Sequence, residues 1–232
     1  MITDTFDPLY QALVCLAFIF MVCLNPNIMY GQEIHSSLPE SIDPDANYVF
    51  YLHGMIVQQQ GANAVSEQYG PYEYNKIVKA LAELNDHVIS EVRKKDAQIE
   101  GYGQLLADQA KDLINAGVPP ENISIVGASL GAYMAVEAAI KLKNQNVKIA
   151  LLGMCSDYGL DYFAKRNEEL CGNFLSIYET SDGPGSCAPL LDDNTCKAGF
   201  REISLNMGNG HGFLYKPYPE WMRPLQQWIE TK

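Results

Sequence analysis

The sequence predicts an α/β fold in which a mostly parallel sheet of about six strands is covered by helices on both faces. Short runs of apolar, β-branched and aromatic residues alternate along the chain with longer stretches whose apolar residues recur at helical spacing. Hydrophobic residues make up 47% of the 232 residues, so the chain is long enough to bury a sizeable core. Strands that alternate with helices form parallel sheets because each helical crossover returns the chain to the same sheet edge.

Six apolar runs are expected to form the strands. In chain order they are 48–52, 87–92, 123–126, 147–152, 174–178 and 203–207. Apolar residues three and four positions apart predict helices at 72–84, 104–116, 130–142 and 221–229. Neither a repeat nor a low-complexity linker interrupts this alternation, so residues 32–232 are expected to form a single domain.

The first 31 residues are set apart by an apolar run. Residues 12–24 are 13 consecutive apolar residues, which is short for a membrane span and typical of the core of a secretory signal. We interpret 1–31 as a signal peptide or an uncleaved N-terminal anchor. A buried helix is the alternative, because the segment carries no Lys or Arg before the run. The protein is therefore expected to be exported, either periplasmic or secreted, or anchored at the membrane by this segment.

The chain is strongly acidic. Sixteen Lys and Arg against 28 Asp and Glu give a net charge of −12, and the first basic residue is Lys76. A protein that binds nucleic acid is expected to present a basic face. Nucleic acid is therefore not an expected partner, nor is a stable membrane partner unless the N-terminal segment stays attached.

A glycine-flanked serine is the first feature that indicates chemistry. The sequence Gly127-Ala-Ser129-Leu-Gly131 falls between an expected strand and an expected helix. Glycines at both ends permit a sharp strand-to-helix turn that exposes the serine hydroxyl at the end of the sheet. The alternative is an ordinary glycine-rich packing turn.

Two of the four histidines are expected at the same sheet edge as Ser129. All strands of a parallel sheet end at one edge, so His53 after the first strand and His211 after the last strand meet the serine there. His87 begins a strand and is expected at the opposite edge. His35 lies just after the N-terminal segment 1–31, before the first expected strand. The chain order serine, acid, histidine selects His211 as the base. Its alternative role is that of an exposed loop histidine.

The acid is expected between the serine and the histidine, at the end of a strand. Asp182 lies a few residues after the penultimate strand and is our choice. Asp157, which follows the preceding strand, and Glu179, which lies very close to the strand end, are the alternatives. Asp192 and Asp193 rank behind them.

The His53-Gly54 turn, the serine turn at Gly127–Gly131, Asp182 and the His211 loop together resemble a known family, the small α/β-hydrolases of the serine esterase and lipase type. The resemblance covers about residues 46–230 and implies Ser129 as nucleophile, Asp182 as acid and His211 as base. It also implies an oxyanion hole made by backbone N–H groups. The oxyanion donors are expected to be the backbone N–H groups of Met55 and Leu130. The supporting residues are His53, Gly54, Gly127 and Gly131.

The chain departs from the fuller family pattern in two ways. The two antiparallel strands that usually precede the His-Gly strand are missing from the sequence pattern. Only about 20 residues separate the fourth and fifth strands, so no large lid is expected. The resemblance thus implies a minimal α/β-hydrolase and a serine hydrolase that cleaves an ester or related acyl bond. The alternatives are an acyltransferase that uses the same triad, and a non-catalytic binding module with this fold.

The partner expected for such an enzyme is a small acyl or ester substrate. The long connection 55–71 is expected to border the site, and its glutamines, Asn63, Glu67 and Tyr69 suggest a polar rim that suits a hydroxylated or small polar acyl group. The alternative is a surface loop that only covers the sheet.

Four cysteines remain outside the apolar run, and an even number in an exported chain suggests two disulfides. Since Cys155 and Cys187 follow strands whereas Cys171 and Cys196 precede strands, the pairs Cys155–Cys187 and Cys171–Cys196 are expected at opposite edges of the sheet. Cys187–Cys196 is the alternative. The chain has no Cys-x-x-Cys pair and its histidines are scattered, so neither a metal nor another cofactor is expected.

Overall fold

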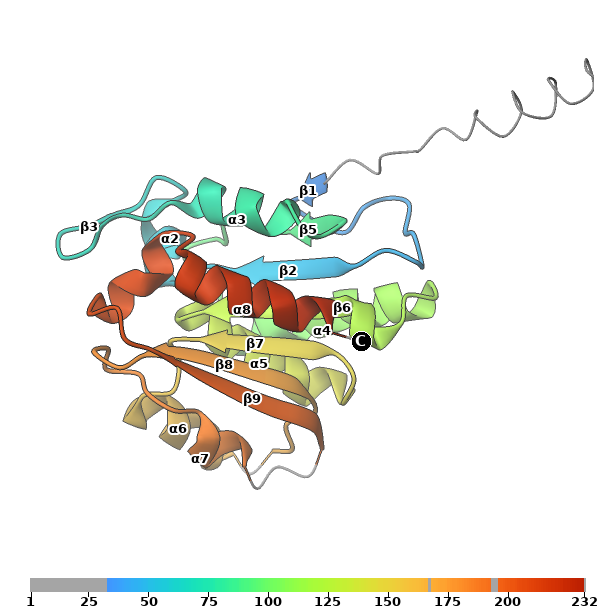
Figure 1. The fold of residues 1–232 in the computed structure, drawn as a ribbon. Coiled ribbons are helices and arrows are strands. Elements are labelled where there is room, and N and C mark those ends of the chain that lie inside the picture. Colours follow the sequence, from blue (N-terminus) through green and yellow to red (C-terminus); the bar gives the residue numbers. More distant parts are fainter. Residues whose placement is uncertain (1–32, 167, 193–195, 232) are drawn as a thin grey trace, which may run out of the picture. The chain divides into compact units, whose positions relative to one another are not determined.

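The computed structural model describes residues 33–166, 168–192 and 196–231 (Figure 1). These residues belong to one compact unit. The segment interpreted as a signal peptide or anchor, residues 1–31, lies outside the described residues. Within the described ranges no helix is both long enough and apolar enough to cross a membrane.

The core of the unit is a parallel sheet of seven strands (Figure 1). Their spatial order is β1-β5-β2-β6-β7-β8-β9, and every neighbouring pair is parallel. The strands are β1 (Glu33–His35), β2 (Tyr48–Leu52), β5 (His87–Ile89), β6 (Ile123–Ala128), β7 (Lys148–Leu152), β8 (Gly172–Glu179) and β9 (Lys197–Leu205). The predicted α/β class and parallel sheet are confirmed, but the sheet has one strand more than the six expected.

Helices connect the strands. The α-helices are α2 (Met55–Gln60), α3 (Tyr74–Ala82), α4 (Ile99–Asn115), α5 (Leu130–Leu142), α6 (Asp157–Ala164), α7 (Ala188–Leu191) and α8 (Pro219–Glu230). Two 3-10 helices, η1 (Pro120–Asn122) and η2 (Gly210–Tyr215), and a small hairpin of β3 (Val65–Ser66) and β4 (Gly70–Pro71) complete the described elements. In the described part of the connection between β7 and β8 the only helix is α6, as the expected lack of a large lid requires.

Alternating residues of the central strands pack against the two helical layers. In β2, Tyr48 and Phe50 belong to the apolar cluster that includes α4 and α5. Val49 and Tyr51 belong to the cluster that includes α3 and α8. Figure 1 shows α3 and α8 on the same side of the sheet. Successive strand side chains point to opposite faces, so a continuous apolar strand is what a sheet covered on both faces requires.

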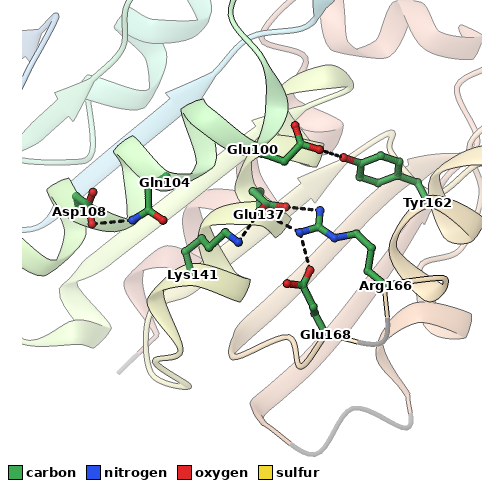
Figure 2. A network of polar contacts seen from close by, with 8 residues as sticks. All are labelled: Glu100, Gln104, Asp108, Glu137, Lys141, Tyr162, Arg166 and Glu168. Carbon is green, nitrogen blue, oxygen red and sulfur yellow. Dashed lines mark hydrogen bonds and ion pairs between the residues drawn. The ribbon is translucent and has the colours of Figure 1, made fainter.

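A buried ion pair joins the helices of one layer (Figure 2). The Glu137 carboxylate on α5 is fully buried and accepts hydrogen bonds from Arg166, at 2.6 and 3.1 Å. Lys141, one turn further along α5, lies 3.3 Å from the same carboxylate. Nearby, the hydroxyl of Tyr162 on α6 donates to Glu100 on α4. A buried carboxylate without such partners would cost several kcal/mol, so these bonds fix how α4, α5 and α6 pack.

Several element boundaries differ from the sequence expectation. β1 was not expected because it is only three residues long. β5 ends at Ile89 instead of residue 92, since the chain turns there into the loop that carries Arg93. α4 begins at Ile99, whereas the sequence predicted a start at residue 104. Its first turns were missed because Gly101 and Gly103 interrupt their apolar pattern. β9 begins at Lys197 instead of residue 203 and is half exposed at a sheet edge, where a strand needs no apolar run.

Both expected disulfides are confirmed. Cys155 bonds to Cys187 with a Cα–Cα distance of 5.2 Å, and Cys171 bonds to Cys196 with 4.6 Å. The first lies beyond the ends of β7 and β8, where the backbone N–H of Gly185 also donates to the Cys155 carbonyl at 2.9 Å. The Cys187–Cys196 alternative is wrong, because strand polarity keeps these residues near opposite edges.

Gly131→Ala is expected to be strongly destabilising. A Cβ at position 131 would lie 2.1 Å from the carbonyl oxygen of Leu52, so the backbone of α5 or β2 must shift. Overpacking of this kind typically costs about 3 kcal/mol at its upper range. In a domain of this size that loss lowers Tm by roughly 6–12 °C.

Gly101→Ala provides the matched control, since position 101 lies on an exposed part of α4 and nothing would lie within 4 Å of the added Cβ. We expect its Tm to be equal to or above that of the wild type, because alanine favours a helix by about 1 kcal/mol over glycine. Calorimetric scans of both variants test the packing, and equal Tm values would contradict it.

Candidate active site

Ser129 occupies a sharp turn between β6 and α5. Its backbone has φ 52° and ψ −118°, a conformation that residues other than glycine rarely adopt. The turn requires close packing around it: a Cβ at Gly127 would lie 2.4 Å from the Cα of Ala132. Ser129 is also the N-cap of α5, so its side chain lies at the positive end of that helix.

The structure brings together the three side chains that the sequence indicated. The Nε2 atom of His211 lies 2.9 Å from the Oγ atom of Ser129. The Nδ1 atom of the same ring lies 2.6 Å from Oδ2 of Asp182. The His211 side chain is 26% exposed and that of Asp182 only 7%, so the hydrogen-bonded chain runs from a sheltered carboxylate toward an accessible pocket.

None of the alternative acids takes the place of Asp182. Asp157 is exposed in the first turn of α6, and Asp192 is exposed just after α7. Asp193 lies outside the described residues. Glu179 is buried and directs its carboxylate toward backbone N–H groups instead of the imidazole.

Glu179 links the acid loop to the histidine loop. Its carboxylate accepts hydrogen bonds from the backbone N–H groups of Met207 at 2.8 Å, Ser181 at 3.2 Å and Gly208 at 3.3 Å. The Ser181 hydroxyl also donates to it, at 3.0 Å. Burial alone would raise the pKa of this carboxyl, but these hydrogen bonds outweigh burial and lower it. The ionised carboxylate therefore keeps the loops after β8 and β9 in contact.

A second turn, His53-Gly54, lies against the serine. A Cβ at Gly54 would be 3.5 Å from the Cβ of Ser129, so the two turns are in near contact. Met55 and Leu130 are the first residues of α2 and α5. The first N–H groups of a helix have no acceptor within that helix. Both expected oxyanion donors are therefore N–H groups at helix N-termini beside the serine.

Arg93 holds the His53-Gly54 turn from behind. Its backbone N–H donates to Nε2 of His53 at 3.1 Å, and its guanidinium donates to the His53 carbonyl. Its Nε atom donates to Gln58 on α2 at 3.1 Å. Arg93 is 3% exposed, and no acceptor for its Nη1 atom occurs among the described residues. Sequence reasoning missed Arg93 because 40 residues separate it from His53 and no local pattern marks the contact.

His53 is expected to stay neutral across the whole working pH range. Its Nε2 accepts from Arg93, so Nδ1 carries the proton and donates to the Gly54 carbonyl at 2.9 Å. Burial first, and the Arg93 charge second, lower the pKa of His53 from 6.5 to about 3. In an NMR titration the His53 ring signals should therefore show no midpoint between about pH 8 and pH 5. A midpoint near 6.5 would contradict the buried arrangement.

The same lowered pKa has a consequence for stability. Between pH 6.5 and about 3 the unfolded chain binds a proton at this histidine and the folded chain does not. The contribution of this histidine to the free energy of unfolding is therefore complete above pH 6.5, and it is lost as the pH falls through this window. The slope from this group is up to about 1.4 kcal/mol per pH unit, which urea unfolding at a series of pH values measures.

A pocket of about 380 Å³ opens beside Ser129 and His211. Its walls are mainly apolar, and Gln59 and Gln60 are its polar side chains besides the serine and histidine. The remaining lining residues are Gly54, Met55, Ile56, Tyr72, Leu214 and Tyr215. The connection 55–71 does border the site, as expected. Of the predicted polar rim, Gln59 and Gln60 line this pocket, whereas Gln58 is hydrogen-bonded to Arg93 and Met55 and Ile56 add apolar surface.

The parallel sheet, the strained serine turn after β6 and the absence of a large lid between β7 and β8 in the described residues define an α/β-hydrolase fold. Many solved structures match the chain, and two of them show the extent of the likeness. One is XC6422 from Xanthomonas campestris, described as an α/β serine hydrolase without a lid, with TM-score 0.50 and 14% identity over 84% of each chain. The other is SOBER1 from Arabidopsis thaliana, with TM-score 0.50 and 13% identity over 79% of this chain and 97% of that one. Neither a protein-family model nor a curated protein sequence matches the chain.

Proposed function

We propose that the protein is a serine hydrolase that cleaves an ester or a related acyl bond through an acyl-enzyme on Ser129. The observation that carries this proposal is the hydrogen-bonded series from Ser129 through His211 to Asp182, with distances of 2.9 and 2.6 Å. A nucleophile, a base and an orienting acid in hydrogen-bond contact have the geometry that proton transfer from an attacking serine requires. A binding module with this fold has no need of the series.

The proposed reaction begins with attack of the Ser129 hydroxyl on the acyl carbonyl. Nε2 of His211 takes the hydroxyl proton, and Asp182 stabilises the resulting imidazolium. The tetrahedral oxyanion accepts hydrogen bonds from the N–H groups of Met55 and Leu130. His211 then gives its proton to the departing alcohol. Water, deprotonated by the same imidazole, attacks the acyl-enzyme, and the acid is released as the proton returns to Ser129.

The pocket supports a short to medium acyl chain as the substrate class. An apolar cavity of about 380 Å³ is at the small end of the range for ligand pockets. Met55, Ile56 and Leu214 offer apolar surface to an acyl chain but no room for a long one. We therefore infer that butyrate and hexanoate esters are better substrates than acetate, and far better than palmitate.

A panel of p-nitrophenyl esters tests this substrate class. We expect kcat/KM to rise from acetate to butyrate or hexanoate, since each methylene that enters the pocket is worth about 0.8 kcal/mol. It should fall by at least about 10-fold at palmitate, because that chain is too long for a cavity of about 380 Å³. Ile56→Trp should narrow the pocket and shift the preference toward acetate. Val65→Trp is the matched control, because Val65 is 56% exposed on the β3–β4 hairpin and does not line the pocket. Equal profiles for the two variants would contradict the assignment of the pocket.

We also propose that the protein works outside the cytoplasm. Two disulfides support this, because such bonds persist in oxidising compartments. The apolar run at 12–24 is the segment that would direct export.

A further inference from the structure

Three side chains of the kinds that bind metals meet on β1 and β5, the two strands at one side of the sheet, and none of the triad residues lies on these strands. Glu33 and His35 lie at the two ends of β1, and His87 begins β5. Residues two positions apart share one face of a strand. Glu33 is also paired with His87 in the parallel register of the two strands. The three side chains therefore extend from the same face of the sheet.

Their ligand atoms form a nearly regular triangle. Nε2 of His35 lies 3.1 Å from Nδ1 of His87 and 3.2 Å from Oε2 of Glu33. Oε2 of Glu33 lies 3.8 Å from Nδ1 of His87. Ligand atoms around a tetrahedral zinc ion, with bonds of about 2.0–2.2 Å, are roughly 3.3–3.6 Å apart. The three observed distances bracket this range.

Hydrogen bonds alone satisfy this triangle poorly. Nε2 of His35 carries at most one proton, yet it lies within hydrogen-bond distance of both the other imidazole and the carboxylate. One N–H cannot point along both directions at once. A cation at the centre of the triangle is attracted by a lone pair from each of the three atoms.

We propose that Glu33, His35 and His87 bind one Zn²⁺ or a similar divalent transition metal, with water in the fourth position. Two imidazoles and one carboxylate suit such ions, whereas Ca²⁺ and Mg²⁺ require more oxygen ligands. The side chain of Glu33 is 57% exposed, that of His35 20% and that of His87 10%. The two histidines are thus mostly buried, and a metal ion can enter from solvent on the side of Glu33.

The surroundings favour a cation and hold one ligand in place. The ring of Tyr48 stacks on that of His87 with 4.7 Å between centroids and an angle of 15°. The carboxylates of Asp43 and Asp86 are near enough to act electrostatically on His87. No Lys or Arg precedes Lys76 in the sequence, so the N-terminal strands bring no competing positive side chain.

The site assigns the metal a structural role. β1 is a three-residue edge strand whose Ile34 side chain is 53% exposed. Backbone bonds that hold it to neighbouring segments include Glu33 N–H to the Asp86 carbonyl at 3.0 Å and Ser90 N–H to the His35 carbonyl at 2.8 Å. A metal bound by both strands would tie β1 to β5. The proposal does not depend on the hydrolase function, because the triad lies where the strands end.

Zinc titration of the untagged protein, first stripped with a chelator, tests the proposal. We expect native mass spectrometry to show one Zn²⁺ per chain and the bound metal to raise Tm. His35→Ala should weaken binding, measured by competition with a chromogenic chelator, by at least about 100-fold, since even outer contacts of a metal site are worth 10–100-fold. His35 is the deciding position because it lies on the edge strand. His87→Ala removes a ring packed on Tyr48 and is therefore secondary.

Ser129→Ala and His211→Ala are the controls, and both should bind Zn²⁺ as the wild type does. Ester hydrolysis by His35→Ala should match that of the stripped wild type. Zinc affinity that is unchanged in His35→Ala would overturn the proposal. So would loss of zinc binding in His211→Ala, or a wild type that binds no Zn²⁺ and shows no rise in Tm.

Discussion

Ser129→Ala should lower kcat/KM for p-nitrophenyl butyrate by about 10⁴-fold or more, because no other group can carry the acyl intermediate. The fold should be unaffected. Alanine has the same Cβ as serine, so the cost of the positive φ at this position does not change. Circular dichroism and Tm serve to confirm that the variant is folded.

Ser37→Ala is the matched control, since Ser37 is exposed near β1. Its kcat/KM should equal that of the wild type. If Ser129→Ala kept more than about a tenth of the activity, the acyl-enzyme on this residue would be excluded.

Asp182→Asn is expected to produce the second large loss, about 10⁴-fold in kcat. The carboxylate accepts a hydrogen bond from the Nδ1–H group of His211, at 2.6 Å, and so holds the tautomer in which Nε2 is free to take the proton of Ser129. An amide that turns its NH₂ group to Nδ1 donates instead, and favours the tautomer in which Nε2 is already protonated. KM should change little, because Asp182 does not line the pocket.

Asp157→Asn and Glu179→Gln test the two carboxylates that the sequence offered as alternatives to Asp182. Asp157 is exposed on α6, so its variant should retain full activity. Glu179→Gln removes the charge that accepts hydrogen bonds from Met207 and Gly208, so it should lower Tm along with activity. A larger kcat loss in Asp157→Asn than in Asp182→Asn would reverse the assignment of the acid.

Much of the fold and of the candidate site could be predicted from the sequence because both follow from local patterns and strand polarity. The buried strands are continuous apolar runs, and their C-terminal ends must share one edge of a parallel sheet. That constraint placed Ser129, Asp182, His53 and His211 at one edge and selected the cysteine pairs, and the chain order serine, acid, histidine then chose His211 over His53. No side-chain contact had to be known in advance.

The remaining features depend on contacts that leave no local signal. Arg93 meets His53 across 40 residues, and His35 meets His87 across 52. The second contact exists only because β1, too short to be recognised, adds to the sheet edge beside β5. The sequence expectation of no metal site rested on the spacing of histidines along the chain, whereas a parallel register brings distant residues to one face.

Labelling with a fluorophosphonate tests the central claim most directly, because this probe reacts with a serine only when a base and an oxyanion hole activate it. We expect one phosphonyl group per chain by intact mass, located on Ser129 by peptide mapping. Labelling should be absent in Ser129→Ala and slowed strongly in Asp182→Asn. A folded wild type that takes up no probe, or takes it up at another residue, would contradict the proposed active site.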